Sequence, residues 1–143
     1  MDAREAAIRL LARREHSARE LWRKLTERGL AAEVIGPTLA ALAAEGLQSD
    51  ARFAAEYLRS RAERGYGPLR IRAELAERGV AGSEIATALG EAEADWAVRA
   101  CEVHRRRFGD GRPVDRRERA RQMRFLQQRG FDGEQIRAAL GTH

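Results

Sequence analysis

Apolar positions recur three and four residues apart along most of the chain, which is the spacing of one face of an α-helix. One such pattern occurs three times: a leucine, an Arg-Gly pair three residues later, an apolar residue, and then an isoleucine and a leucine four residues apart. The copies cover residues 25–39, 75–89 and 126–140. Because glycine adopts the left-handed conformation at little steric cost, each copy predicts a helix, a turn and a second helix.

An arginine precedes the glycine in every copy, at Arg28, Arg78 and Arg129. Each falls in the last turn of a predicted helix, where a cation interacts favourably with the carbonyl end by about 0.3 to 1 kcal/mol. We therefore assign these three arginines to helix ends rather than to a binding site.

Turn and capping residues divide the rest of the chain into further helices. The first third predicts helices over about 2–14, 18–28 and 32–45, the last of which tolerates Pro37 if it begins at Ile35 or Gly36. The second third predicts helices that begin at Ser49 or Asp50, at Pro68, and at Gly82 or Ser83. The last third predicts helices from about 95 to 108 and from 116 to 129, and a short last helix that follows Asp132 and ends at Gly141. Three pairs have capping-box spacing: Ser17 with Glu20, Asp115 with Glu118, and Asp132 with Gln135.

The inward faces of these helices are similar but not identical. Leu21, Trp22 and Leu25 form the predicted buried face of the second helix. Four residues before the repeated leucine, the first two copies have Leu21 and Ile71, whereas the third has Gln122. We expect the inward face of this third helix to be rotated toward Met123 and Phe125.

The fold class predicted for these 143 residues is all-α: three tandem three-helix repeats stacked into an elongated or curved array. We place the repeats at residues 1–48, 49–93 and 94–143. Units of this size form a marginal core alone, so stacking supplies the missing burial.

Charge is distributed unevenly. The chain has 27 basic and 22 acidic residues, for a net charge of +5. The three repeats carry eight, seven and twelve basic residues against seven, eight and seven acidic ones, so the excess lies in the third. A basic surface of this kind favours a nucleic-acid or acidic-protein partner.

Two groups of residues are therefore candidates for partner or DNA binding. The larger comprises Arg105, Arg106, Arg107, Arg112, Arg116, Arg117, Arg119, Arg121 and Arg124, and the smaller comprises Arg61, Arg64, Tyr66, Arg70 and Arg72 around the Gly-Pro turn. About six phosphate contacts would give salt-dependent binding without sequence preference. The alternative for both groups is a solvated helix face.

Signals of catalysis are weak. The histidines, His16, His104 and His143, are too scattered for a metal site, and no phosphate-binding or dinucleotide-binding loop is present. Cys101 lies in a helical pattern, which favours a buried structural thiol. With no apolar run near the roughly 20 residues of a membrane span and no secretory leader, we predict a cytoplasmic, non-enzymatic monomer that binds neither membranes, metals nor cofactors.

Several motifs together resemble one family. They are Arg14-Glu15-His16-Ser17 with Glu20-Leu21 and Lys24-Leu25, Asp50 with Phe53-Ala54 and Tyr57, Gly65-Tyr66-Gly67-Pro68 with Ile71 and Glu74-Leu75, and Arg129-Gly130-Phe131. In order and spacing they resemble the RecX family of bacterial recombination regulators over nearly the whole chain.

The resemblance implies tandem three-helix repeats that bind the RecA filament on single-stranded DNA and mostly inhibit it, limiting filament extension, ATP hydrolysis and strand exchange. It implies no catalysis and no cofactor. Contact with single-stranded DNA, or with duplex DNA, would be weak and made through phosphates. Two alternatives remain: a stand-alone, sequence-nonspecific DNA-binding helical protein, and a purely structural helical adaptor.

Overall fold

The structure is a computed structural model that describes residues 2–141; His143 lies outside them. All regular secondary structure in this part of the chain is helical, which confirms the all-α prediction. The helices are α1 (Ala3–Arg13), α2 (Ala18–Glu27), α3 (Ala32–Ala44), α4 (Asp50–Glu63), α5 (Pro68–Glu77), α6 (Gly82–Glu91), α7 (Trp96–Phe108), α8 (Arg116–Arg129) and α9 (Gly133–Leu140). Across residues 2–141, no helix is both long and apolar enough to cross a membrane.

Local capping signals fix most helix starts. Ser17 forms a complete capping box with Glu20 at the start of α2, as Asp132 does with Gln135 at α9. The box predicted at α8 is only half formed. Asp115 accepts a hydrogen bond from the Glu118 amide, but the Glu118 carboxylate turns instead to Arg121 and Gln122.

α3 begins at Ala32, in agreement with the predicted range of about 32–45, so Pro37 lies inside the helix and not in a first turn that begins at Ile35 or Gly36. Ile35, Leu39 and Leu42 lie on one face of this helix, and all three are buried. Burial of three aliphatic side chains on this face is enough to offset the single helical hydrogen bond that a proline removes.

The described residues form two compact units. The first contains the residues up to Tyr57 together with Leu75–Gly90, and the second contains Leu58–Glu74 together with the residues from Glu91 onward. The division between the units falls inside α4, after Tyr57, and inside α5, before Leu75. Each of these two helices therefore contributes residues to both units.

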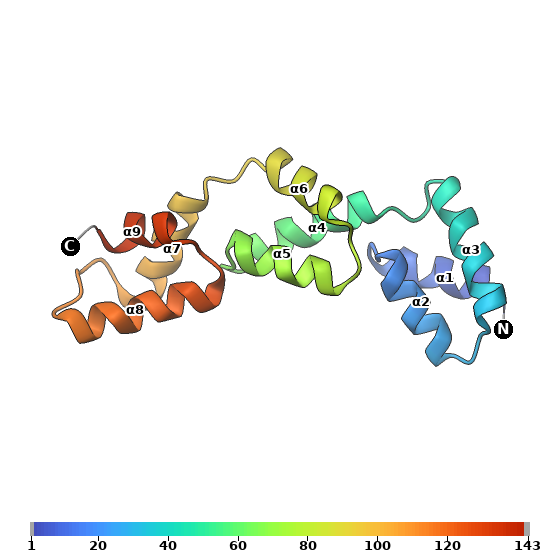
Figure 1. Cartoon of the computed structure of the whole chain (residues 1–143), viewed down its shortest axis with the longest axis horizontal. Coiled ribbons are helices and arrows are strands. Elements are labelled where there is room, and N and C mark those ends of the chain that lie inside the picture. Colours follow the sequence, from blue (N-terminus) through green and yellow to red (C-terminus); the bar gives the residue numbers. More distant parts are fainter. Residues whose placement is uncertain (1, 142–143) are drawn as a thin grey trace. The chain divides into compact units, whose positions relative to one another are not determined.

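In the first unit, α1, α2 and α3 pack against one another around a core of aliphatic side chains (Figure 1). Leu21, Leu25 and Ile35 are fully buried there. Trp22, which we predicted to be buried, is 41% exposed, so this prediction is wrong. The core of small and aliphatic residues is closed by Leu21 and Leu25, which leaves the bulky indole at the margin of the buried face, beside Gly36.

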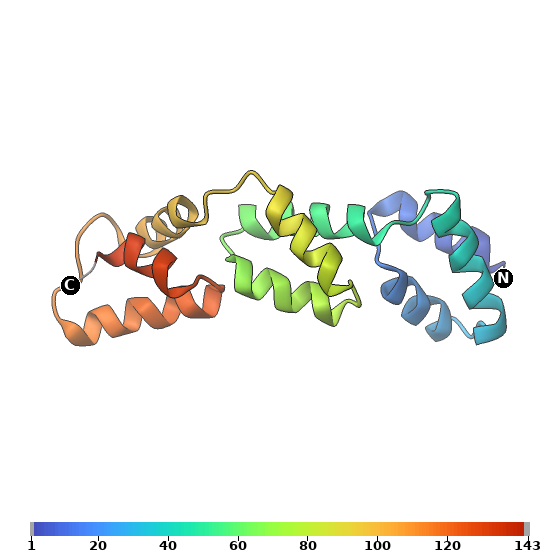
Figure 2. The same cartoon turned by 45° about the horizontal axis from the view of Figure 1, so that its top comes forward.

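In the second unit, α7, α8 and α9 surround a core that contains Ala100, Leu126, Phe131, Ile136 and Leu140 (Figure 2). The packing of α7 against α9 is visible in this view.

Gln122 is buried on the inward face of α8, contrary to the predicted rotation of that face toward Met123 and Phe125, which are only partly buried. Its Oε1 lies 2.6 Å from His104 Nε2 on α7, and its Nε2 donates to Glu118 at 3.0 Å. Because both ends of the amide are hydrogen-bonded, α8 keeps the orientation of the other repeats despite a polar residue at an apolar position.

Candidate partner-binding surface

Most candidate arginines of the third repeat are exposed. Arg105, Arg106 and Arg107 occupy the last turn of α7, Arg112 lies in the following loop, Arg116 and Arg117 begin α8, and Arg121 and Arg124 lie further along it. Basic residues in the last turn of α7 are favourably placed for the helix dipole.

Three of these arginines already have partners. Arg119 is only partly exposed and donates to the carbonyls of Leu140 and Gly141 at 3.1 and 2.6 Å, which caps the carbonyl end of α9. Arg121 forms a two-point ion pair with Glu118, with distances of 2.9 and 2.7 Å. Arg105 Nε lies 4.0 Å from a carboxylate oxygen of Asp110, in an ion pair that is longer and more exposed than that of Arg121 with Glu118.

The other arginines of this group are available to a partner. Within residues 2–141 no ion pair is found for Arg106, Arg107, Arg112, Arg116, Arg117 or Arg124. These six exposed cations, rather than all nine, make up what we call the arginine surface.

Aromatic rings lie beside these arginines. Phe108 and Phe125 meet edge to face, with ring centroids 5.4 Å apart. The Arg107 guanidinium lies 5.5 Å from the Phe125 centroid and 5.8 Å from that of Phe108, and Arg121 lies 5.1 Å from Phe108. Sequence reasoning missed both phenylalanines, although each directly follows an arginine in the sequence.

The smaller candidate group is organised around Tyr66. The guanidinium carbons of Arg61, Arg70 and Arg129 lie 3.8, 4.5 and 4.7 Å from the centre of its ring. Arg129, which the sequence assigned to a helix end, is therefore also part of this cluster. Arg64 and Arg72 are exposed, and within residues 2–141 neither is found in a cation–π contact with this ring.

Glu74 offsets one of the three positive charges of this cluster. Arg61 donates to both of its carboxylate oxygens at 2.9 and 2.8 Å, and Arg70 adds a bond of 3.1 Å. The Arg61 and Glu74 side chains are only 18% and 16% exposed. Arg61 is thus occupied in a largely buried, two-point ion pair, which makes it a structural group more than a contact for a partner.

Residues 66–70 contact the turn of residues 129–131, and both segments belong to the second unit. We call this contact the second joint. The Gly67 amide donates to the Arg129 carbonyl at 2.7 Å, and the Leu69 amide donates to the Gly130 carbonyl at 2.9 Å. Arg70 also donates to the Gln128 carbonyl at 3.0 Å. Arg70 therefore serves this joint as well as the Tyr66 cluster.

The first joint lies within the first unit, where residues 17–20 meet the turn of residues 78–80. Ser17 Oγ donates to the Arg78 carbonyl at 2.7 Å, and Arg78 Nε lies 3.9 Å from a carboxylate oxygen of Glu20. The Arg78 guanidinium also lies 4.7 Å from the centre of the Tyr57 ring. Sequence spacing gave the position of Arg78 but not these contacts.

His16 is buried beside the first joint and faces Lys24, whose Nζ lies 3.0 Å from His16 Nε2. Burial lowers the pKa of His16, and the positive charges of Arg14 and Lys24 act in the same direction. With Nδ1 hydrogen-bonded to the Arg14 carbonyl, the neutral ring donates there and accepts from Lys24.

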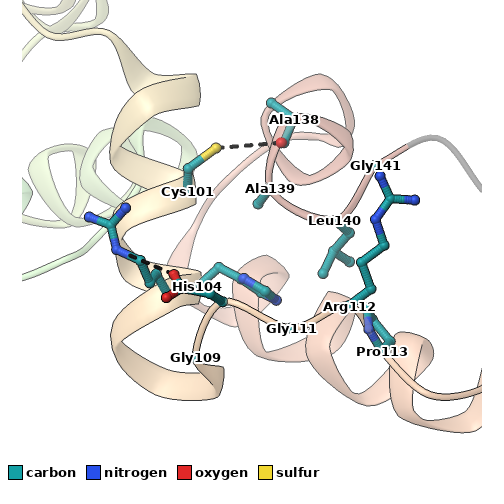
Figure 3. A pocket seen from close by; sticks show the side chains of 12 residues that line it. Cys101, His104, Gly109, Gly111, Arg112, Pro113, Ala138, Ala139, Leu140 and Gly141 are labelled. Atoms are coloured by element: carbon teal, nitrogen blue, oxygen red, sulfur yellow. Dashed lines mark hydrogen bonds and ion pairs between the residues drawn. The ribbon is translucent and has the colours of Figure 1, made fainter.

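Cys101 is partly exposed rather than buried, because it lines a cavity of about 320 Å³ in the third repeat. Figure 3 shows its thiol directed at the Ala138 carbonyl of α9, to which it donates at 3.4 Å. His104 and the loop that carries Arg112 lie at other parts of the same wall. Within residues 2–141 no group of histidine, cysteine and carboxylate side chains is arranged to hold a metal ion.

These features define a class: an all-α protein of three-helix repeats with a cationic, arginine-rich surface on the last of them. Family profiles described as the first, second and third three-helix domains of RecX match residues 3–42, 49–89 and 93–140. Since these matches cover most of its length, the chain belongs to the RecX family.

Individual relatives agree. The chain is 55% identical to the regulatory protein RecX of Halorhodospira halophila over 139 residues, which are 97% of this chain and 86% of the relative. It is 51% identical to the regulatory protein RecX of Pseudomonas entomophila over 133 residues, covering 93% and 86%.

Solved structures support the fold. A crystal structure of a regulatory protein RecX superposes with a TM-score of 0.79 at 24% identity, covering 96% of this chain and 70% of the other. RecX from Lactobacillus salivarius gives the same TM-score at 19% identity, covering 96% and 91%.

Proposed function

We propose that this protein is a non-enzymatic regulator of the RecA recombinase. It binds the RecA filament on single-stranded DNA and mostly inhibits it, limiting filament extension, ATP hydrolysis and strand exchange. The observation that carries this proposal is the match of all three domains to the RecX family, whose relatives are named as regulatory proteins.

The arginine surface is the part we assign to the partner. Its exposed guanidinium groups suit the phosphates of single-stranded DNA or acidic groups on RecA. Phe108 and Phe125 add partly exposed rings beside these cations, a combination suited to unpaired bases. Residues 1–48, 49–93 and 94–143 are the domains we propose, with the DNA-facing role in the third.

Charge reversal of Arg116 and Arg117 to Glu tests this assignment. Both side chains are exposed at the start of α8, and neither has an ion-pair partner within residues 2–141, so their replacement spares the fold. Arg119 and Arg121 are unsuitable because they cap α9 and pair with Glu118. Reversal of Arg9 and Arg13 on α1 changes the net charge equally and is the charge control; the exposed ion pair of Arg9 with Glu5 that it removes contributes little to stability.

The assay is a titration of DNA-dependent ATP hydrolysis and strand exchange by RecA at low salt. Wild type and the α1 control should inhibit substoichiometrically, whereas the α8 variant should require at least about tenfold more protein, as expected for like charges placed at a contact. A wild-type chain that leaves both RecA activities unchanged would rule out the proposed function. Equal inhibition by all three proteins would instead remove the arginine surface from the site.

The stand-alone DNA-binding alternative is separated by binding to a single-stranded oligonucleotide without RecA. Each lost phosphate contact should flatten the dependence of log affinity on log salt by about 0.7. Tight DNA binding combined with no effect on RecA would favour this alternative.

A further inference from the structure

The two joints use the same positions of the repeat. Ser17 and Gly67, 50 residues apart, both stand at the start of the second helix of their repeat and both donate to a carbonyl. The acceptors, the carbonyls of Arg78 and Arg129, belong to equivalent Arg-Gly turns. In this fold, an Arg-Gly turn is therefore a docking site for the first turn of a helix, and we call such a turn a receptor turn.

Both receptor turns are covered by the helix that docks on them. A Cβ at Gly79 would lie 2.7 Å from the side chain of Arg19, and one at Gly130 would lie 2.6 Å from the backbone nitrogen of Arg70. The apolar residues that follow these glycines, Val80 and Phe131, are buried.

The first repeat carries a third turn of the same geometry, Arg28-Gly29-Leu30. Gly29 has a φ of +87°, against +85° and +101° for its two counterparts. The Leu30 amide donates to the Leu25 carbonyl at 3.2 Å, and the equivalent bonds in the other two turns are both 3.1 Å. The backbone of this turn therefore has the same conformation as the two receptor turns on which a helix docks.

Unlike its counterparts, this turn is open. A Cβ at Gly29 would meet no atom within 4 Å, Arg28 is exposed, and Leu30 is only partly buried. Within residues 2–141 no hydrogen bond to the Arg28 carbonyl is found. The receptor surface is present, and the described chain does not cover it.

We propose that the Arg28-Gly29-Leu30 turn docks the first turn of an α-helix on the protein that this chain regulates. The first joint gives the chemistry of that helix: a hydroxyl N-cap that donates to the turn carbonyl, and an acidic residue three positions later that faces the turn arginine, as Ser17 and Glu20 do with Arg78. The identity of the partner as RecA rests on the proposed function, whereas the helix chemistry rests on the joints.

A second copy of this chain fits the turn less well. Its unused second-helix start is that of α8, where the N-cap Asp115 cannot donate as the Ser17 hydroxyl does, and where Glu118, at the position of Glu20, is already paired with Arg121. Arg116 and Arg117 follow it and would face Arg28 and the neighbouring Lys24 with like charge. At the second joint the Tyr66 ring lies between the like charges of Arg70 and Arg129, whereas no cation–π contact of Arg28 is found within residues 2–141, which favours a helix from another protein.

Gly29→Asn is a direct test. Asparagine tolerates the left-handed conformation better than most residues, and the space around Gly29 is empty, so the fold is retained. A side chain there would obstruct a docked helix, as it would at Gly79. Gly46→Asn is the matched control, because Gly46 has a φ of +77° and an equally open environment but lies outside the receptor turns.

Inhibition of RecA and binding to an oligonucleotide alone are measured for wild type, both glycine variants and Arg28→Glu, with Arg13→Glu as the charge control. We expect Gly29→Asn and Arg28→Glu to need at least about tenfold more protein for half-inhibition, with unchanged DNA binding. Thermal unfolding of Gly29→Asn should match that of Gly46→Asn, and Arg28→Glu should unfold at a lower temperature, because it loses the favourable interaction of a cation with the carbonyl end of its helix. The two controls should match wild type in inhibition of RecA and in DNA binding.

Wild-type inhibition that survives unchanged in Gly29→Asn overturns the docking turn but leaves the proposed function intact. A wild-type chain that neither binds nor inhibits RecA overturns both. Sedimentation identifies the other occupant: concentration-dependent self-association that Gly29→Asn abolishes would assign the turn to a second copy of the chain and refute the partner helix.

Discussion

Replacing Gly67 with alanine should open the second joint. An added Cβ would lie 2.5 Å from the carbonyl carbon and oxygen of Gly130 and 2.7 Å from the amide nitrogen of Phe131. All three are backbone atoms, so no side chain can swing aside. Ordinary contact begins near 3.4 Å, and the two segments must therefore separate by about 0.9 Å.

That separation is enough to break the hydrogen bonds of the joint. The bond from Gly67 to the Arg129 carbonyl would lengthen from 2.7 to about 3.6 Å, and the bond from Leu69 to Gly130 from 2.9 to about 3.8 Å, both beyond hydrogen-bonding range. Each contributes about 1 kcal/mol, and the Arg129 contact with Tyr66 adds about 0.5 to 1 kcal/mol. The total of about 2 to 3 kcal/mol corresponds to a 30- to 150-fold more populated open state.

Amide hydrogen exchange at Leu69 measures this opening locally, and urea unfolding measures the global free energy. Gly36→Ala is the control, since its Cβ would lie 3.7 Å from Trp22, an ordinary contact, inside helix α3. It should stabilise the protein by about 0.5 to 1 kcal/mol. If Gly67→Ala left the Leu69 exchange rate within twofold of wild type and the unfolding free energy unchanged, the steric account of this joint would be refuted.

Three further predictions concern polar groups. Gln122→Leu restores the apolar residue of the other repeats, yet it should lower the free energy of unfolding by about 1 to 3 kcal/mol, because it removes the hydrogen-bond partner of buried His104. Urea unfolding measures this loss. The double variant Gln122→Leu with His104→Phe should recover much of it. The lowered pKa of His16 means that the unfolded chain takes up a proton at higher pH than the folded one, so stability should fall as pH drops from about 7 through 6.5; a flat profile, or an equal slope in His16→Gln, would contradict this. Hydrogen bonds from Arg121 and then Gln122 lower the pKa of Glu118 to about 2, so its contribution is present above pH 4.5 and lost as pH falls toward 2; acid titration of Glu118→Gln should lack that part of the loss.

The sequence by itself determined the helices and their repetition, because these depend on neighbours within one or two turns. Ser17 and Glu20, three residues apart, cap a helix start, and Pro68 suits a first helical position because its ring fixes φ. The Arg-Gly turns end helices through local backbone geometry. The repeats, the excess of arginine in the third repeat and the family resemblance could be recognised for the same reason.

Only the tertiary structure decided which polar groups are occupied and which are open to a partner. Gln122 is buried because His104, on another helix, meets it, and Arg61 is occupied because Glu74 and Tyr66 surround it. The contact of Arg70 with Gln128 joins residues 58 apart. No local pattern encodes such pairings, since the charge and spacing of an arginine are the same whether its guanidinium faces a carboxylate, a ring or water.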